Sequence, residues 1–405
     1  MTPKRVVFLM SDTGGGHRAA AEAIRAAMER CYPGVYTFEL VDVYRRYTPF
    51  PMNLMPEIYP RWVNWAAASW KLGFRLTDGR RRSALAMAVI NRWWRRGMRR
   101  LAAERPADVV VSVHSLFSRP VMHAYNQSQA FRPRFVAVVT DLVSAHAFAF
   151  EKDADRCLIP TLAAYERGRA MGLDPRRLCI TGLPIHPRFF DGLCDKPDAR
   201  RQLGWDMDRP VVLVIGGADG MGPVFPIARA IDRLGLGIQL AVVAGRNRRL
   251  RRRLEAAEWR GPIFVYPFLD SLAGLMAGAD ILVTKAGPAT ICEACAAGLP
   301  MVLSGAVPGQ EDGNVAYVVE NGAGVYAPSP SLAAQAVGAW LTAGPQRLAD
   351  IGRRARALAQ PDAAWRIAEE IHQQAQKPPV RTRFRVRGAT RQPCLRQTPE
   401  DGWVL

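Results

Sequence analysis

The chain has 405 residues, of which 49% are hydrophobic, and it carries a formal net charge of +19 at pH 7. This length exceeds what one ordinary hydrophobic core holds, so we expect two domains of about 150–200 residues each. The charge requires a polyanionic partner or surface, which nucleic acid, anionic lipid or nucleotide phosphates would each supply. No stretch approaches the roughly 20 apolar residues of a membrane-spanning helix, so any membrane contact is expected to be peripheral.

The seven cysteines fall at irregular spacings and no secretory signal precedes them, which is typical of a reducing, cytosolic compartment. Cys292 and Cys295 form a Cys-x-x-Cys pair inside an alanine-rich stretch of helical composition. Neither a second pair nor a histidine partner completes a zinc site. We therefore expect neither a metal nor another cofactor.

The predicted elements begin with a strand at residues 5–10, a glycine loop and an alanine-rich helix over residues 18–30. Later strands are again short apolar runs, separated by stretches of helical composition. Two consecutive series of such units predict two doubly wound, parallel-sheet α/β domains, with a boundary near residues 183–195. The further predicted strands cover residues 36–41, 108–113, 135–139 and 156–159 in the first series, and 211–215, 238–243, 263–265, 281–283 and 301–303 in the second.

Residues 44–105 break this alternation and hold five of the ten tryptophans together with many arginines. Met87, Trp94 and Leu101 belong to an apolar row at helical spacing, with arginines on another face. The interpretation we favour is a helix in the headgroup region of an anionic membrane; the other is a helix packed on the core with a solvated face. Prolines among the apolar residues of 52–70 suggest an irregular flap on the acceptor side of the cleft, in place of one regular helix. The residues predicted to contact the membrane are Trp62, Trp65, Trp93, Trp94, Arg95 and Arg96.

The first strand is followed by Ser-Asp-Thr-Gly-Gly-Gly-His, at the edge where open α/β sheets bind ligands. Gly14, Gly15 and Gly16 let the backbone approach a substrate closely and place His17 at a helix N-terminus. The loop is neither a dinucleotide fingerprint nor a Walker loop. A histidine here can act as general base on a hydroxyl, although the helix end lowers its basicity. Its alternative role is to cap the helix.

The second domain repeats the arrangement. Residues 216–222 form another glycine loop after a strand, and residues 284–290 precede a helix that bears Glu293. Small residues followed by proline at a helix start expose N–H groups and the positive end of the helix dipole, which form a diphosphate site without a metal. Glu293 is placed for a ribose diol, and residues 310–314 suit a sugar. The predicted contacts in these segments are Gly217, Gly220, Met221, Thr284, Lys285, Gly287, Pro288, Ala289, Thr290, Gln310, Glu311 and Asn314.

Five motifs between residues 4 and 375 resemble the monogalactosyldiacylglycerol synthase family: SDTGGGHRAAAEAI, GGADGMGP, AGRNRRL, TKAGPATICEA and PGQEDGNVAYVVENGAG. That family belongs to the class with two Rossmann-like domains, GT-B, which includes the lipid II-forming N-acetylglucosaminyltransferase. The resemblance implies an N-terminal domain, residues 1–188, for diacylglycerol and the membrane, and a C-terminal domain, residues 189–360, for a UDP-sugar. It also implies a helix over 361–376 that crosses back. The basic residues 377–405 are expected to form a disordered tail.

The resemblance also implies roles for single residues. His17 becomes the candidate base, with Asp141 and His114 on the same acceptor side of the cleft. Arg246 would stabilise the departing phosphate, and Phe268 would pack near uracil. On the donor side, the diphosphate would contact residues 287–290, the ribose would contact Glu293, and the hexose would contact Gln310, Glu311 and Asn314.

Three segments depart from the family's usual pattern. Ala218 and Ala289 replace glycines, which is tolerable where φ is negative. Arg119 replaces the second histidine of a His-Pro-Leu-Met-x-His segment, which bears on activation by lipid.

The predicted reaction is the inverting transfer of galactose from UDP-galactose to the sn-3 hydroxyl of 1,2-diacylglycerol, which gives a β-linked galactolipid. The partners are then a UDP-hexose, diacylglycerol and an anionic phospholipid surface, at the cytoplasmic face of the cell membrane, with no prediction of an oligomeric state. The alternatives are a transferase that uses UDP-glucose and one that acts on an undecaprenyl-linked lipid. Nucleic-acid binding would explain the charge but leaves both glycine loops unexplained.

Overall fold

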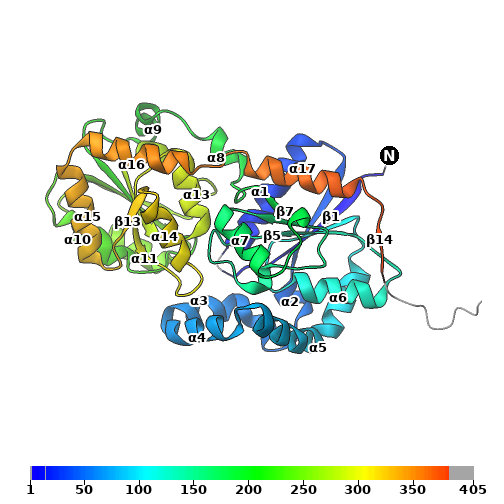
Figure 1. Cartoon of the computed structure of the whole chain (residues 1–405). Helices are drawn as coiled ribbons and strands as arrows, with labels where there is room; N and C mark the ends of the chain where they lie inside the picture. Colours follow the sequence, from blue (N-terminus) through cyan, green and yellow to red (C-terminus); the bar gives the residue numbers. More distant parts are fainter. Residues whose placement is uncertain (1, 14, 383–405) are drawn as a thin grey trace, which may run out of the picture.

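The computed structural model describes residues 2–13 and 15–382. The predictions for Gly14 and for the tail beyond residue 382 lie outside these residues. The chain forms two α/β halves side by side, each built around a six-stranded parallel sheet (Figure 1). The predicted α/β class with two parallel sheets is confirmed.

The N-terminal sheet has the strand order β2-β1-β3-β5-β6-β7. In β1 every side chain from Val6 to Met10 is buried, as expected for a parallel strand covered on both faces. Val6 and Phe8 face one core cluster, and Val7 and Leu9 face the other. The strands are β1 (Lys4–Met10), β2 (Tyr36–Asp42), β3 (Val109–Ser112), β5 (Arg134–Val138), β6 (Arg156–Ile159) and β7 (Leu178–Ile180).

The C-terminal sheet has the order β10-β9-β8-β11-β12-β13. All strands predicted for this half are present. Two strands were not predicted, β13 in this half and β7 in the other. Each has only three residues, which is too short for an apolar pattern to be recognised. The same holds for the two-residue strands β4 (Phe131–Arg132) and β14 (Val380–Arg381), which pair antiparallel. The sheet consists of β8 (Val211–Ile215), β9 (Gln239–Gly245), β10 (Ile263–Pro267), β11 (Ile281–Lys285), β12 (Met301–Gly305) and β13 (Gly324–Tyr326).

Each sheet has a point where the strand order reverses. In the N-terminal half β1 pairs with β2 on one side and β3 on the other, and in the C-terminal half β8 pairs with β9 and β11. The loops that leave the carboxyl ends of such neighbouring strands diverge and leave a crevice between them. Both predicted glycine loops start at these two crevices.

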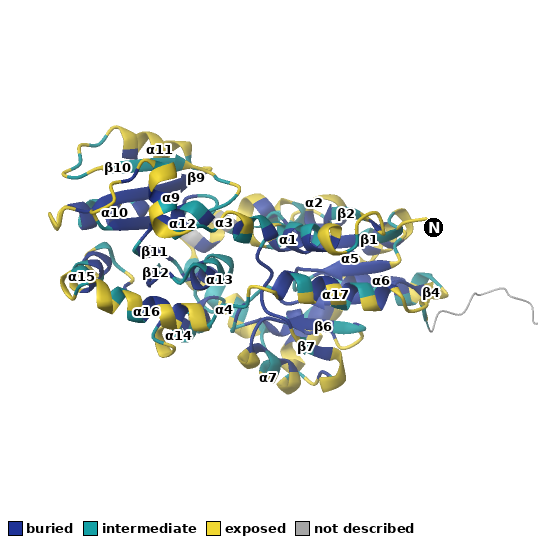
Figure 2. Cartoon of the chain, turned by 90° about the horizontal axis from the view of Figure 1, so that it is seen from above, coloured by how far each residue is buried: buried dark blue, intermediate teal, exposed yellow. Residues whose placement is uncertain are grey.

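Helices cover both faces of each sheet, so the strands are buried and the outer helix faces are exposed (Figure 2). The shorter connections include α2 (Val43–Tyr47) and α8 (Pro187–Asp191). The remaining covering helices are α1 (Gly16–Cys31), α6 (Ser118–Ser128), α7 (Leu162–Ala170), α9 (Lys196–Leu203), α10 (Val224–Asp232), α11 (Arg248–Glu255), α12 (Ala273–Gly278), α13 (Pro288–Ala297), α14 (Asp312–Glu320), α15 (Pro330–Thr342) and α16 (Pro345–Ala357).

The last long helix, α17 (Ala363–Ala375), lies on the N-terminal half (Figure 1). Its buried Ile367 and Ile371 belong to the same core cluster as β1 and α1. The guanidinium of Arg156 pairs with the Glu370 carboxylate at 2.5 and 2.7 Å. The chain therefore passes into the C-terminal half once and returns, which ties the two halves together.

Residues 44–105, called the insertion below, form helices along one side of the molecule. After the 3₁₀ turn η1 (Met52–Leu54) come α3 (Met55–Trp65), α4 (Ala67–Thr77) and α5 (Arg80–Glu104). The segment is not one regular helix, as predicted, but its predicted irregularity is wrong: Pro56 sits in the first turn of α3, where a missing N–H costs nothing, and the two helices are separated at Ala66.

One helix, α5, carries two apolar rows. Met87, Trp94 and Leu101 are buried in the core, so the membrane interpretation of this row is wrong. Trp94 is 1% exposed and packs edge-on against Tyr44 at 5.9 Å, so it cannot touch a membrane surface. The other predicted membrane residues, Trp62, Trp65, Trp93, Arg95 and Arg96, are exposed.

The second row of α5 was not predicted. Leu85, Val89 and Trp93 recur every four residues and are exposed. Exposed apolar residues also recur every three or four residues from the end of η1 through α3 (Leu54, Ile58, Trp62 and Trp65) and on α4 (Leu72 and Leu76). Within the part of the chain that the structure describes, no helix combines the length and apolarity needed to cross a membrane.

Candidate functional site

The two halves approach each other at their glycine loops. A Cβ placed on Gly15 would lie 3.6 Å from the Cβ of Ala218 and 3.9 Å from a guanidinium nitrogen of Arg246. Gly15 also has a φ of +78°, so both its conformation and this close approach favour glycine. The acceptor-side and donor-side loops therefore form two walls of one cleft.

His17 lies in the first turn of α1. Its Nδ1 is 2.8 Å from the carbonyl oxygen of Val113, and because a carbonyl only accepts, Nδ1 carries the proton and Nε2 keeps a lone pair. Burial lowers the pKa of His17 to about 4, and the Val113 hydrogen bond opposes this only in part. The N-cap residue of α1 is Gly15, and among the described residues the His17 side chain bonds to Val113 and Thr140, so the alternative role as a helix cap is wrong. His17 is a neutral proton acceptor at physiological pH.

His114 supports His17 from inside the fold. Their ring centroids are 4.4 Å apart, and His114 stacks on Phe117 at 4.2 Å. Burial, followed by the neighbouring His17, holds the pKa of His114 well below its usual value. His114 is thus a neutral packing partner of the candidate catalytic histidine.

Asp141 follows β5 and lies where the two halves meet. Its Oδ1 accepts a hydrogen bond of 3.0 Å from Nε2 of Gln310, a residue of the donor side. Burial raises the pKa of Asp141 to about 6; the Gln310 hydrogen bond opposes this rise, and the charge of Glu311 adds to it. Asp141 is therefore ionised at pH 7 and has the pKa that suits a general base.

The N-terminus of α13 forms the donor wall. Gly287 precedes the helix and no side chain caps it, so the N–H groups of Ala289 and Thr290 point out of the helix. A Cβ on Gly287 would lie 3.2 Å from Nζ of Lys285. An ammonium group and a positive helix end thus converge, which suits a diphosphate. Ala289 is helical, so its methyl group adds no strain.

Lys285 is held in place by a buried carboxylate. Its Nζ donates to Glu311 Oε1 at 2.6 Å, and the backbone N–H of Val307 donates to Glu311 Oε2 at 2.8 Å. Because Glu311 is 4% exposed and both of its oxygens are engaged, its predicted contact with the hexose is wrong. Glu311 instead holds the Lys285 ammonium beside the start of α13.

Two more predicted donor contacts are enclosed by the fold. Asn314 is 1% exposed, and its Nδ2 donates to the carbonyl oxygen of Ala286 at 2.9 Å. Thr284 is also 1% exposed, inside β11. Direct contact of either side chain with a donor is therefore wrong, and Asn314 serves to fix the turn before α13.

The glycine loop after β8 borders the same cation. Gly217 and Gly220 both have positive φ. A Cβ on Gly220 would lie 2.3 Å from the carbonyl oxygen of Ala244, and one on Gly217 would lie 3.6 Å from Cε of Lys285. Gly220 is therefore required for packing, and Gly217 keeps access to Lys285 open.

At the rim of the cleft the guanidinium of Arg246 lies 4.2 Å from the ring centroid of Phe268. The ring is partly exposed, so one face stays available for a base. Glu293 lies one turn into α13, and burial raises its pKa to about 7. Its carboxyl group has no hydrogen-bond or ion-pair partner among the described residues. The Glu293 carboxyl group and one face of Phe268 are therefore available to a ligand, while the Arg246 guanidinium also pairs with the Asp219 carboxylate at 3.4 Å.

A cavity of about 220 Å³ opens beside Lys285 and Met221. Val63 and Ala67 of the insertion line one side of it, and its other walls are mostly apolar residues of the C-terminal half. The insertion also reaches the cleft through Tyr59, whose hydroxyl donates to Gln310 Oε1 at 3.2 Å. Sequence reasoning placed residues 52–70 on the acceptor side but named none of these three residues, because it gave them no individual role in the cleft.

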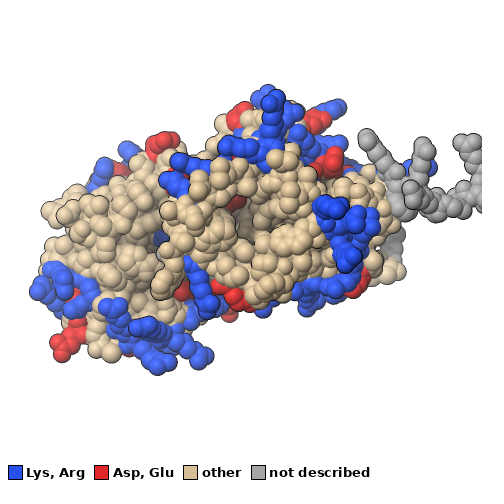
Figure 3. Space-filling view, turned by 90° about the horizontal axis from the view of Figure 1, so that it is seen from below, with Lys and Arg blue, Asp and Glu red and all other residues tan. Residues whose placement is uncertain are grey.

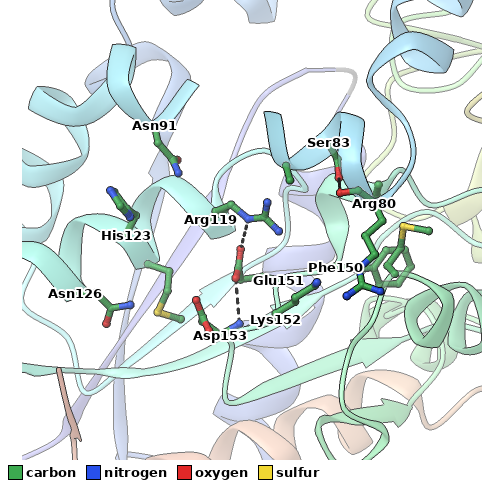
Figure 4. Close-up of a pocket in the computed structure, with 14 residues that line it drawn as sticks. Arg80, Ser83, Asn91, Arg119, His123, Asn126, Phe150, Glu151, Lys152 and Asp153 are labelled. Atoms are coloured by element: carbon green, nitrogen blue, oxygen red, sulfur yellow. Dashed lines mark hydrogen bonds and ion pairs between the residues drawn. The ribbon is translucent and has the colours of Figure 1, made fainter. Parts of the chain in front are cut away.

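A larger cavity of about 340 Å³ lies between α5, α6 and the loop around Glu151 (Figure 4). Arg119 lines it and donates from Nε to Glu151 Oε2 at 3.0 Å. The side chains of Arg80 and Lys152 line it without an ion-pair partner among the described residues. The replacement of the family's second histidine by Arg119 therefore affects this cavity. The cleft itself keeps the first histidine of that segment, His114.

The Cys292–Cys295 pair lies on α13. Burial raises the pKa of both thiols, so both stay protonated at neutral pH. Within the described residues no group of three or more His, Cys, Asp or Glu side chains is arranged to hold a metal ion.

Comparison with known proteins gives two family matches. Residues 17–185 match the family described as "Monogalactosyldiacylglycerol (MGDG) synthase", and residues 211–348 match the "Glycosyltransferase family 28 C-terminal domain". The chain is 35% identical over 383 residues to the chloroplastic monogalactosyldiacylglycerol synthase 1 of Arabidopsis thaliana, covering 93% of this chain and 72% of that one. It is 37% identical over 377 residues to synthase 2 of the same plant, covering 91% and 80%.

Solved structures share the fold at low sequence identity. MurG of Acinetobacter baumannii superposes with a TM-score of 0.57 at 16% identity, covering 92% of this chain and 100% of that one. The S. aureus MnaA–UDP structure gives 0.59 at 14% identity, covering 91% and 96%. These likenesses confirm the arrangement of two Rossmann-like domains.

Proposed function

Because this chain belongs to the monogalactosyldiacylglycerol synthase family, we propose that it transfers galactose from UDP-galactose to the sn-3 hydroxyl of 1,2-diacylglycerol, with inversion. Family membership establishes a sugar-nucleotide-dependent glycosyltransferase of galactolipid synthesis. The observation that supports the finer proposal is one cleft with proton acceptors on one wall, His17 and Asp141, and an uncapped helix end with Lys285 on the other.

On the acceptor wall we assign the proton to Asp141. The acceptor oxygen bonds to the anomeric carbon while the bond from that carbon to UDP breaks on the opposite face, and the hydroxyl proton passes to the carboxylate. Asp141, with a pKa of about 6, is a stronger base than His17, with a pKa of about 4. His17 stays neutral and offers Nε2 as an acceptor for a second hydroxyl group.

On the donor wall the leaving diphosphate gains negative charge as the bond breaks. The N–H groups at the start of α13 and the ammonium of Lys285 stabilise that charge, and Arg246 approaches from the rim. Glu293 holds the ribose, and Phe268 packs on uracil. These charges take the place of a divalent metal.

The lipid acceptor would reach the cleft from the side of the insertion. The exposed apolar rows of α3, α4 and α5 share this side, and Figure 3 shows it as an uncharged expanse with lysines and arginines gathered at its margins. Such a surface suits peripheral binding to an anionic membrane, with apolar side chains in the headgroup region. The apolar cavity beside Lys285 is lined from this side by Val63 and Ala67.

The test is transfer of radiolabelled hexose into chloroform-soluble lipid on diacylglycerol vesicles, with and without phosphatidylglycerol. We expect labelling from UDP-galactose that Asp141→Asn abolishes. Preference for UDP-glucose would correct the sugar alone. No labelling from either donor would overturn the acceptor, and an undecaprenyl-linked acceptor would then be tested.

A further inference from the structure

We propose that Tyr59 is a positioning residue for this transfer: its hydroxyl fixes the orientation of the Gln310 amide, and that amide holds Asp141. The inference rests on the proposed function in one respect, the assignment of Asp141 as the base. It adds a residue of the insertion to the catalytic arrangement.

The orientation of the amide follows from which groups can donate. Gln310 presents an oxygen on one side and an NH₂ group on the other, and the two are similar in shape. A carboxylate only accepts, so Nε2 must face Asp141 Oδ1, at 3.0 Å. The Oε1 atom then faces Tyr59, whose hydroxyl donates to it at 3.2 Å. Burial raises the pKa of Tyr59 well above its usual value, so the donor keeps its proton.

Tyr59 is itself held firmly by aromatic packing. The Tyr59 ring lies edge-on to the Trp70 ring, with their centroids 5.1 Å apart. Trp62 also lies edge-on to Trp70, at 5.5 Å. The indole N–H of Trp62 donates to Ser69 Oγ at 2.8 Å. Helices α3 and α4 are thereby clamped to each other, and the Tyr59 hydroxyl has a fixed position.

The loop that carries Gln310 is held from its other side as well. A Cβ on Gly309, which has a φ of +87°, would lie 3.2 Å from the ring of Phe74 in α4. The backbone N–H of Gly313 donates to Ser144 Oγ at 2.9 Å across the cleft. The loop is therefore held between the insertion and the N-terminal half, and the hydrogen bond from Tyr59 is one of the contacts that hold it.

The groups around Asp141 determine what the loss of this contact does. Burial and the charge of Glu311 raise its pKa, and the Gln310 hydrogen bond lowers it. Lys285 is paired with Glu311, and His17 reaches the neighbouring Thr140 at 3.2 Å. Without the Tyr59 hydroxyl the amide is free to rotate, so the hydrogen bond to the carboxylate is weakened and the pKa of Asp141 rises.

The experiment compares Tyr59→Phe with Tyr125→Phe. Tyr125 is a buried tyrosine of the same half, and among the described residues its hydroxyl donates a hydrogen bond to the carbonyl oxygen of Arg105, at 3.4 Å. Both changes remove one hydroxyl and keep the ring. The first readout is the pH profile of kcat/KM. The second, which needs no activity, is the carboxyl-carbon titration of Asp141 by NMR in protein labelled at aspartate, assigned by its loss in Asp141→Asn.

We expect Tyr59→Phe to move the titration of Asp141 and the acidic limb of kcat/KM to higher pH together. Weakening of the hydrogen bond from Gln310 to the Asp141 carboxylate predicts an activity about five- to tenfold lower at pH 6, with a smaller loss at pH 8. Gln310→Ala should shift the titration in the same direction, and adding Tyr59→Phe to it should shift it no further. Tyr125→Phe should move neither readout.

An unchanged Asp141 titration in Tyr59→Phe would overturn the inference, and so would an equal shift in Tyr125→Phe. Absence of hexose transfer by the unaltered protein would overturn the proposed function instead. In that case the NMR titration still decides whether Tyr59 positions Asp141 through Gln310.

Discussion

Lys285 and Glu311 form an ion pair of 2.6 Å at the N-terminus of α13, with the carboxylate buried. We predict that Lys285→Met lowers the transfer rate by about 100-fold, because one donor facing the developing phosphate charge is lost. It should also lower the free energy of unfolding by about 3 kcal/mol, because Glu311 is left buried without its partner.

The double variant Lys285→Met with Glu311→Gln separates the two effects. Its neutral amide removes the buried charge, so most of the stability should return while the transfer rate stays low. Thermal unfolding and initial transfer rates are the two measurements. Recovery of the rate together with the stability would mean that Lys285 has only a structural role.

The pH dependence of kcat/KM should report Asp141. The carboxylate must be ionised to accept a proton and its pKa is about 6, so activity should fall as the pH drops through 6. His17, with a pKa of about 4, stays neutral in that range. Asp141→Asn should lower the rate by about 100- to 10,000-fold. An acidic limb near pH 4 that disappears in His17→Ala would instead identify His17 as the base.

Close packing of α5 on α2 predicts a strong effect at Gly97. A Cβ at this position would lie 1.7 Å from the carbonyl oxygen of Tyr47, so Gly97→Ala must displace the helix. We expect a loss of about 1–3 kcal/mol or more in the free energy of unfolding, measured by denaturant titration. Gly73→Ala is the matched control, because nothing lies within 4 Å of its Cβ position. Equal effects at both positions would contradict this packing.

The exposed row of α5 should contribute to membrane binding. We predict that replacing Leu85, Val89 and Trp93 by glutamine weakens binding to anionic vesicles by about 100-fold, at about 1 kcal/mol for each partly immersed side chain. Vesicle sedimentation measures the effect. Replacing Leu234, Leu236 and Leu332, which are exposed on the C-terminal half, is the control. A similar loss in the control would show that the binding surface lies elsewhere.

Chelation tests the proposed metal-free donor site. We expect EDTA to leave the transfer rate unchanged, because Lys285, Arg246 and the start of α13 supply the positive charge around the diphosphate. The same assay with added Mg²⁺ or Mn²⁺ completes the measurement. A rate lost with EDTA and restored by either ion would contradict the proposal.

Much of the fold was predictable because its signals are local. The strand at 211–215 was predicted with the bounds that the structure has, since a buried parallel strand is a continuous apolar run. The glycine loop before His17 and the Gly287–Pro288 helix start were predicted because turns and helix termini require particular residue types. Strands of three residues such as β13 lie below the length at which such signals can be read.

Local sequence patterns were sufficient to predict the two-domain architecture, the family and the two glycine loops that face each other across the cleft. Packing was needed to show which of two adjacent tryptophans, Trp93 or Trp94, faces solvent, because both fit an apolar row on the same helix. It also decided that Glu311 and Asn314 are buried, and that Tyr59 reaches Asp141 through Gln310. These contacts join segments 169 and 251 residues apart, and their existence depends on how the two halves and the insertion pack, which no local pattern encodes.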